Sequence, residues 1–302
     1  MSLHIFGSII TAQGCAANNR GENEGNITTL QKLLWSGQVH TTVSAEAIRW
    51  ALRYYWQKNG QKVNRQWDDD RDDHKWSDEN WSGWIKENGE TFIDDDLLGF
   101  MIAEGAKLEG EEESNKKGTR KKGTTNKRRG VLEITRAIST TPYAGDISFN
   151  AKSGEKGRTS LYFTEMHATR YQYGFALTPE RLRIKDRCFQ ALDGLINLGE
   201  VAGNHSRFLF DFSPESLILR VTHDPAPRLL YCFQEDNGKI NAPELVNKVK
   251  SRDILPEELF IGGLIGQLPE FQELGANVCV GVKEALEECK TTVKQKMRVN
   301  ND

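Results

Sequence analysis

The alternation of hydrophobic and polar residues predicts a chain that mixes strands and helices. Residues 3–11 are an apolar run rich in β-branched and aromatic side chains, which is typical of a strand. Residues 43–57 place apolar side chains at helical spacing, with Thr41 or Thr42 as the cap and Gly60 as the stop. The same two periods predict helices at 184–197, 242–250 and 282–296, and strands at 131–135 and 217–221.

Residues 147–163 predict a β-hairpin, because two strand-like runs flank a basic tip that contains glycine. Residues 208–212 alternate in the same way and predict a further strand. Evenly spaced aromatic residues on a strand are more often core than stacking surface, and this applies to Tyr171, Tyr173 and Phe175. The order strand, helix, strand pair, helix, strand is that of the RNA-recognition motif. The sequence therefore predicts an α+β fold with a ferredoxin-like sheet.

All seven tryptophans lie between Trp35 and Trp84, so the segment after the first helix is not a linker. We expect residues 60–106 to form a helical insertion. Its acidic run at 68–73 is interpreted as a solvated face, because consecutive carboxylates rarely converge on one metal ion. The triplet at 94–96 is expected to open a short helix, where negative charge is favourable.

Charge is unevenly distributed along the chain, although its net value is only −3. Residues 60–115 hold 17 acids and 6 bases, so the rest of the chain is basic. A cationic surface binds polyanions by releasing their counterions, and nucleic acid is the obvious polyanion. The acidic segment either lies away from that surface or meets a basic neighbour.

Residues 107–130 contain almost no apolar side chains and are predicted to be a disordered basic arm. Eight bases fall within fourteen residues without one acid. We interpret the arm as a DNA-backbone contact, and the alternative is a disordered loop or a targeting patch. The candidate DNA-binding residues are Lys116, Lys117, Arg120, Lys121, Lys122, Lys127, Arg128 and Arg129.

The composition predicts a soluble protein of a reducing cytoplasm. No apolar run approaches the roughly 20 residues that span a bilayer, and the first residues lack the bases that begin a signal peptide. The five cysteines have no Cys-x-x-Cys spacing, which favours buried free thiols over disulfides or zinc. We therefore predict no metal, no cofactor and no membrane partner.

Amides and guanidinium groups near the first strand and helix form a candidate phosphate site. Asn18, Asn19 and Arg20 follow the first strand, and Arg49 and Arg53 lie one turn apart, off the apolar stripe of the predicted helix. For one helix taken alone, a solvated face is the more common explanation. The basic character of the rest of the chain favours nucleic acid.

Five motifs together are specific: residues 18–20, 43–49, 94–101 and 136–139, and a glycine loop that runs through Arg207. They resemble the DevR-type CRISPR-associated proteins, the guide-RNA-binding backbone subunit of type I Cascade, and most closely the type I-B branch. The resemblance covers residues 1–222 well and the remainder poorly. It implies a palm like the RNA-recognition motif, with a helical fingers insertion and a β-hairpin thumb. The implied division is 1–59 for the first part of the palm, 60–130 for fingers and basic arm, 131–240 for the rest of the palm with the thumb near 147–163, and 241–302 for a helical part that completes the palm.

The resemblance also implies partners and contact residues. Several copies would stack along a CRISPR guide RNA beside other Cascade subunits and present the guide for pairing with target DNA. Such a subunit must hold phosphates and riboses of any sequence. The candidate RNA-binding residues are Asn18, Asn19, Arg20, His40, Ser44, Arg49, Arg53, Arg136, Ser139, Lys152, Arg158, His167, Arg170, Asn204, His205, Ser206 and Arg207. No catalytic residue is predicted.

Two other functions stay open at this stage. A metal-independent endoribonuclease that matures repeat RNA would use His40, His167 or His205 for general acid–base catalysis. An RNA chaperone or transcription regulator would bind short sites independently rather than cooperatively along the strand. The residues also do not separate DNA degradation from guided transposition as the outcome of target binding.

Overall fold

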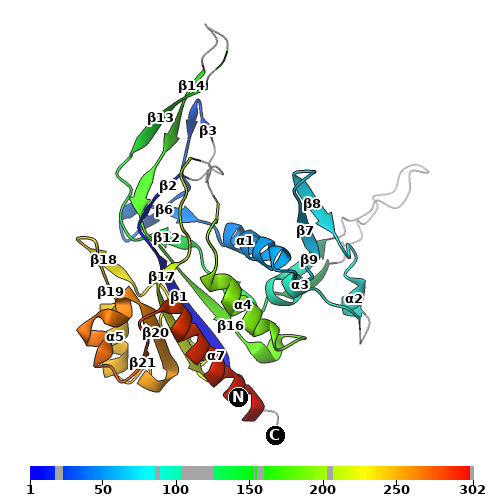
Figure 1. Ribbon diagram of the computed structural model, residues 1–302, viewed down its shortest axis with the longest axis vertical. Helices are drawn as coiled ribbons and strands as arrows, with labels where there is room; N and C mark the ends of the chain where they lie inside the picture. Colours follow the sequence, from blue (N-terminus) through cyan, green and yellow to red (C-terminus); the bar gives the residue numbers. More distant parts are fainter. Residues whose placement is uncertain are drawn as a thin grey trace, which may run out of the picture.

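The computed structural model describes residues 1–17, 23–85, 89–103, 125–152, 154, 160–202 and 207–299. A nine-stranded sheet forms the centre of this part of the chain (Figure 1). Its order is β21-β20-β17-β1-β16-β12-β6-β5, and β11 also pairs with β16. The strands are β1 (His4–Thr11), β5 (Lys32–Trp35), β6 (Gln38–Val43), β11 (Leu132–Ile134), β12 (Ala137–Ser139), β16 (Tyr171–Leu177), β17 (Pro214–Thr222), β20 (Leu259–Gly263) and β21 (Asn277–Val278). The strands predicted at 3–11, 131–135 and 217–221 are confirmed.

β1 shows why the opening of the chain is apolar throughout. It pairs antiparallel with both β16 and β17, so it lies in the interior of the sheet. Ile5 and Ile9 pack into a core on one face, whereas Phe6 and Ile10 pack into a second core on the other. A strand that is covered on both faces needs apolar residues at successive positions rather than at alternate ones.

Helices supply the two covers of the sheet. α1 (Ala45–Lys58), α4 (Arg187–Ile196) and α7 (Val282–Val299) contribute to the core that contains Ile5, and α5 (Pro243–Lys250) contributes to the core that contains Phe6. All four helices were predicted and are confirmed, as is the burial of Tyr171, Tyr173 and Phe175.

The start of α1 corrects a prediction. Its cap is Ser44, whose hydroxyl accepts a hydrogen bond from the Ala47 amide at 3.2 Å. Thr41 and Thr42 belong to β6 instead. Gly60, with a φ of 74°, follows the end of the helix as expected, since glycine adopts this backbone conformation without strain.

The insertion after α1 is not the helical unit that was predicted. It contains β7 (Arg65–Asp68), β8 (Asp73–Trp76), α2 (Ser82–Ile85), α3 (Ile93–Leu98), β9 (Gly99–Ala103) and β10 (Thr125–Arg129). The acidic run at 68–73 forms a hairpin turn, because the Asp68 carboxylate accepts hydrogen bonds from the amides two and three residues later. The prediction is confirmed for the acidic triplet, which lies in the first turn of α3.

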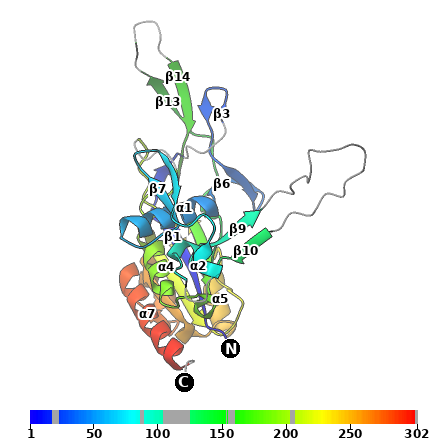
Figure 2. The ribbon, with the colours of Figure 1, turned by 90° about the vertical axis from the view of Figure 1, so that its right-hand side faces the viewer.

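The predicted hairpin is confirmed as β13 (Ile147–Lys152) and β14 (Ser160–Glu165). It extends away from the central sheet, and residues 153 and 155–159 of its tip lie outside the described residues (Figures 1 and 2). Two short strands widen it into a four-stranded sheet, β3 (Asn23–Glu24) and β4 (Ile27–Thr28). At its base, β2 (Gly14–Ala16) pairs with β15 (His167–Thr169).

The segment before β17 and the last 60 residues differ in detail from the prediction. Residues 208–212 form no strand, although Phe210 and Phe212 are buried in the core as a strand pattern would place them. The C-terminal part adds strands as well as helices, since β20 and β21 extend the central sheet. The smaller elements are β18 (Gln234–Asp236), β19 (Lys239–Asn241), α6 (Pro269–Gln272), η1 (Pro179–Arg181), η2 (Pro256–Glu258) and η3 (Leu264–Gln267).

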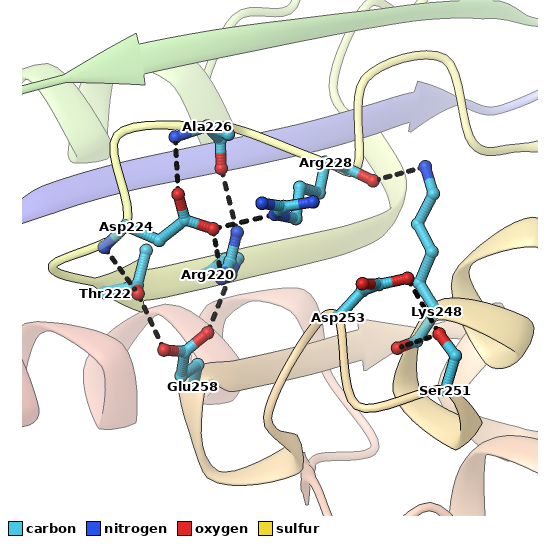
Figure 3. Close-up of polar contacts among 9 residues, drawn as sticks. All are labelled: Arg220, Thr222, Asp224, Ala226, Arg228, Lys248, Ser251, Asp253 and Glu258. Atoms are coloured by element: carbon cyan, nitrogen blue, oxygen red, sulfur yellow. Dashed lines mark hydrogen bonds and ion pairs between the residues drawn. The ribbon is translucent and has the colours of Figure 1, made fainter.

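A buried arginine fastens this C-terminal part to the sheet. Arg220 of β17 is 2% exposed and donates to Glu258 at 2.8 Å, to Asp224 at 3.2 Å and to the Ala226 carbonyl at 2.8 Å (Figure 3). The pKa of Asp224 is lowered to about 2, chiefly by its hydrogen bond from Arg228. The network is internally satisfied, and it explains how one charged residue is tolerated inside a central strand.

The prediction of buried free thiols is confirmed for four of the five cysteines. All five cysteines are free, and all except Cys15 are buried. Among the described residues, no helix combines the length and the apolarity needed to cross a bilayer.

Candidate nucleic-acid interface

The polar side of α1 carries two arginines that differ in their freedom. Arg49 is partly exposed and donates to the Leu98 carbonyl at 2.7 Å. The Arg53 side chain is 17% exposed, and its Nε lies 3.5 Å from the Asp94 carboxylate. Burial lowers the pKa of both guanidinium groups, which stay charged because arginine starts from so high a value. Arg49 is thus the more accessible cation, and Arg53 is largely structural.

Arg65 joins these two arginines and was missed in the sequence. Arg65 comes from β7. Burial is the main cause that lowers the pKa of Arg53, and the nearby charges of Arg49 and Arg65 lower it further. Its guanidinium lies 5.7 Å from the ring centre of Trp76. The Nε atoms of Arg53 and Arg65 are buried without a hydrogen-bond partner. The alternation Arg-Gln-Trp is compatible with a strand, but this segment was expected to be helical.

The acidic triplet of α3 positions this cationic cluster, because its carboxylates accept hydrogen bonds from the segment that carries Arg65. Asp94 accepts from the backbone amides of Asn64 and Arg65 at 2.7 and 3.1 Å. Asp95 accepts from the Asn64 side chain at 3.0 Å and from the Trp81 indole at 2.9 Å. Burial, followed by the charge of Asp94, raises the pKa of Asp95 to about 7. The described part of the chain contains no group of three or more His, Cys, Asp or Glu side chains placed to hold a metal ion.

Asp96, the third member, joins the insertion to the central fold. Its side chain is fully buried and accepts four hydrogen bonds. Arg128 and the Arg183 amide donate at 2.7 and 3.0 Å, and Arg187 and the Ile184 amide donate at 2.9 and 3.1 Å. Strand β10, the loop before α4 and α4 itself therefore converge on one carboxylate.

Arg136 contacts the C-terminal part of β6, which leads into α1. Its Nη1 donates to the Gln31 side chain at 3.3 Å and to the Thr42 hydroxyl at 3.2 Å, two residues before the Ser44 cap. A helix N-terminus offers unpaired amides and a favourable dipole to an anion. Arg136 is thus an exposed cation that contacts the chain two residues before this helix cap.

Arg207 lies against the polar face of hairpin β13–β14. Its guanidinium is 5.1 Å from the ring centre of Tyr162, and its Nη1 donates to the Asn150 side chain at 3.4 Å. The backbone of Lys152 belongs to β13, but its side chain lies outside the described residues. Seven further candidate residues lie wholly outside the described residues: Asn18, Asn19, Arg20, Arg158, Asn204, His205 and Ser206.

Three of the predicted RNA-binding residues form a buried network instead. The His40 ring bonds to the Ser139 carbonyl at 2.7 Å, and the His167 ring bonds to the Thr41 hydroxyl at 2.7 Å. The Tyr171 hydroxyl also bonds to Thr41, at 2.8 Å. Burial lowers the pKa of His167. His40, Ser139 and His167 are 6%, 1% and 5% exposed, which leaves their side chains little surface for direct contact with RNA.

Arg170 is likewise internal. It donates to Glu215 at 2.8 Å and to Glu235 at 2.9 Å, and it is 7% exposed. Two carboxylates thus neutralise a side chain that the strand pattern placed on the polar face. Arg170 therefore has little free charge or surface to offer to RNA, because its buried guanidinium is already paired.

The basic arm is ordered at its C-terminal end. Lys127, Arg128 and Arg129 belong to β10, which pairs antiparallel with β9. Lys127 and Arg129 are exposed, whereas Arg128 is tied to Asp96. The expectation of disorder is wrong for these three residues, because pairing with β9 satisfies their backbone. Residues 104–124, which include Lys116, Lys117, Arg120, Lys121 and Lys122, lie outside the described residues.

A mixed sheet covered on both faces, an extended hairpin and partly exposed arginines near a helix N-terminus define an α+β protein suited to binding a polyanion. Residues 6–242 match the family described as CRISPR-associated negative auto-regulator DevR/Csa2. The chain belongs to this CRISPR-associated DevR/Csa2 family. It is 50% identical, over 98% of both chains, to a Myxococcus xanthus protein named CRISPR-associated protein Cas7/Cst2/DevR.

Solved structures share the fold at much lower sequence identity. A chain of a structure titled "CRISPR RNA-guided surveillance complex, pre-nicking" matches with a TM-score of 0.61 at 11% identity, over 96% of this chain and 99% of that one. A chain of a second "CRISPR RNA-guided surveillance complex" matches with a TM-score of 0.55 at 12% identity, over 95% and 99%. At such identities, the likeness establishes a common fold.

Proposed function

We propose that the chain is a guide-RNA-binding backbone subunit of a type I CRISPR complex, of the type I-B branch. Several copies bind along one CRISPR RNA beside other Cascade subunits and present its bases for pairing with target DNA. The observation that carries the proposal is the 50% identity to a Cas7/Cst2/DevR protein over almost the whole of both chains. The fold shared with chains of RNA-guided surveillance complexes supports it.

The division into palm, fingers and thumb is part of this proposal. The strand order β17-β1-β16-β12, with α1 and α4 as the connecting helices, supports a palm like the RNA-recognition motif. The segment 60–130 acts as the fingers, although it contains the hairpin β7–β8 as well as helices. Hairpin β13–β14 acts as the thumb, and the C-terminal part completes the palm.

Arg49, Arg136 and Arg207 are the cations that we expect on the guide. Their described hydrogen bonds go to carbonyl, hydroxyl and amide groups rather than to carboxylates, which leaves their charge available for phosphate. They come from α1, from the segment before β12 and from the loop that reaches the hairpin. Contacts of this kind are indifferent to base identity, as a subunit reused along different guides requires.

The test compares guide RNAs of two lengths in native mass spectrometry and filter binding. The number of bound protomers should rise in proportion to RNA length. The double substitution Arg136→Gln with Arg207→Gln should weaken assembly and flatten its salt dependence, by about 0.7 in log–log slope for each lost contact. The matched control is Arg71→Gln with Lys75→Gln, two exposed cations on the hairpin β7–β8.

Two results would count against the proposal. One is binding of a single protomer whatever the RNA length. The other is an equal loss of assembly in the double variant and in its control, since charge alone would then explain the binding.

The positions of His40 and His167 do not favour the alternative function, a repeat-RNA endoribonuclease. His40 and His167 are buried in hydrogen bonds to neighbouring backbone and hydroxyl groups, and His205 lies outside the described residues. Incubation with repeat RNA, with and without magnesium, checks this directly. Cleavage that His205→Ala abolishes would replace the binding function by an enzymatic one.

A further inference from the structure

An aromatic ladder crosses the insertion and ends in a cationic layer. Trp76 and Trp81 have ring centres 5.4 Å apart, Trp81 and Phe100 stack at 4.9 Å, and Phe100 and Trp84 lie 5.9 Å apart. The guanidinium of Arg128 then lies 4.3 Å from the Trp84 ring centre. The hairpin β7–β8, α2 and β9 thus contribute to one continuous stack.

The cavity has a volume of about 410 Å³ and lies at the C-terminal end of β10. Its aromatic wall is formed by Trp84 and Phe100, both of which are partly exposed. Its basic wall is formed by Lys127, Arg129 and Arg181, which are all exposed. Within the described residues, no carboxylate lines this cavity. A volume of this size falls within the usual range for a small-ligand site.

Arg128 provides a fixed planar surface between the two walls. Its Nη2 donates to Asp96 at 2.7 Å and to the Arg181 carbonyl at 3.1 Å, so its position over Trp84 is set from two sides. Arg128 and Phe100 are directly opposite each other in the β9–β10 ribbon and share one of its faces. Nucleic-acid bases stack on aromatic rings and on arginine planes alike.

We propose that this cavity binds one unpaired nucleotide, with its base on the Phe100 and Arg128 surface and its phosphate on Lys127 and Arg181. The site is separate from the guide contacts at Arg136 and Arg207, which come from other elements. It rests on the proposed function only in that the chain binds nucleic acid. The nucleotide comes from a DNA strand or from the guide RNA, since both offer the same base and phosphate chemistry.

The test uses the full-length chain and labelled single strands of about 12 nucleotides, one of oligothymidine and one of oligouridine, in fluorescence anisotropy. The charge variant is Lys127→Gln with Arg181→Gln, and the stacking variant is Phe100→Leu. Arg71→Gln with Lys75→Gln is again the control of equal charge. Thermal unfolding of every variant shows whether the fold is kept.

We expect the charge variant to lower the salt slope by about 0.7 relative to the control, because the site holds one phosphate. Phe100→Leu should weaken binding about 5-fold or more, at an unchanged salt slope. Ultraviolet crosslinking of strands that carry 5-iodouracil should place an adduct on Phe100 or Trp84, which a purely structural ladder would not give. Weaker binding of the variants in one series supports the site and identifies the strand that supplies the nucleotide. Weaker binding in both series supports a site that accepts either strand.

Unchanged affinity of both folded variants in both series, with no adduct at the cavity, would overturn the proposal. The stack would then serve only as a small core for the insertion. Failure of the wild-type chain to assemble on guide RNA is a different result. That result would contradict the proposed function, whereas the oligothymidine series would still test whether the cavity binds a nucleotide.

Discussion

Asp96→Asn is the substitution that most directly tests how the insertion is held to the central sheet. The Asp96 side chain is fully buried and receives four hydrogen bonds, two of them from the guanidinium groups of Arg128 and Arg187. Asparagine has nearly the same volume, so no cavity is made. It removes the negative charge and turns a hydrogen-bond donor toward groups that are themselves donors.

The magnitude follows from the charge left behind. The Arg187 side chain is only 10% exposed, and Asp96 is the carboxylate that it contacts. Breaking a buried ion pair by removing one partner costs about 3–5 kcal/mol, because the other charge stays desolvated. The more exposed Arg128 recovers part of its hydration and adds little. We therefore expect a loss of about 3–5 kcal/mol, a large share of the roughly 5–15 kcal/mol of a typical domain.

Urea unfolding of the full chain at neutral pH measures this loss, with tryptophan fluorescence and far-ultraviolet circular dichroism as two probes. Fluorescence reports mainly on the Trp-rich insertion and dichroism on the whole fold. The control is Asp69→Asn, which breaks an exposed pair with Lys58 and should cost less than about 1 kcal/mol. A loss of under about 1 kcal/mol for Asp96→Asn by both probes would refute the reasoning.

Three further predictions concern single positions. Burial raises the pKa of Asp95 from its ordinary 3.8 to about 7, so the folded state holds a proton that the unfolded state releases. The free energy of unfolding therefore falls as pH rises between those two values, and it levels off above them. Asp95→Asn should abolish this slope in urea titrations run at several pH values. Gly7→Ala should destabilise the sheet by about 1–3 kcal/mol, because the added Cβ would lie 2.1 Å from the Phe175 ring, whereas Gly199→Ala, with no atom within 4 Å, should be close to neutral in the same thermal melts. Ser44→Ala should cost about 1 kcal/mol through the lost cap of α1 and Ser44→Asp should restore it; equal stability of the two variants would show that the cap is unimportant.

Elements with a strong hydrophobic period could be predicted from the sequence because their burial is nearly regular. β1 and α1 each have a single apolar pattern, and the hairpin β13–β14 has a clear tip between two alternating runs. The hairpin β7–β8 could not be predicted in this way. Its strands have four residues each, with one tryptophan apiece, and so short a pattern does not separate a strand from a helix.

The candidate site was predicted less well than the fold, for a reason visible in Arg170 and Arg128. A cation in a sequence reveals its charge but not the carboxylate that meets it in space. Arg170 pairs with residues 45 and 65 positions away, and Arg128 pairs with one 32 positions away. His40 and His167 show the same limit, since a polar residue on a strand can equally face solvent or a buried hydroxyl.

The two charge blocks of the sequence are therefore not two separate surfaces, because the acidic segment meets basic neighbours. Asp94 forms an ion pair with Arg53, and Asp96 forms ion pairs with Arg128 and Arg187. Each such pair removes a cation from the inventory that composition assigned to nucleic acid, and it fixes the position of the insertion at the same time. The cations that remain exposed and free of described carboxylates are then the ones to test for binding, and Arg136 and Lys127 lead them. Net charge overestimates a binding surface wherever the fold uses part of that charge for its own construction.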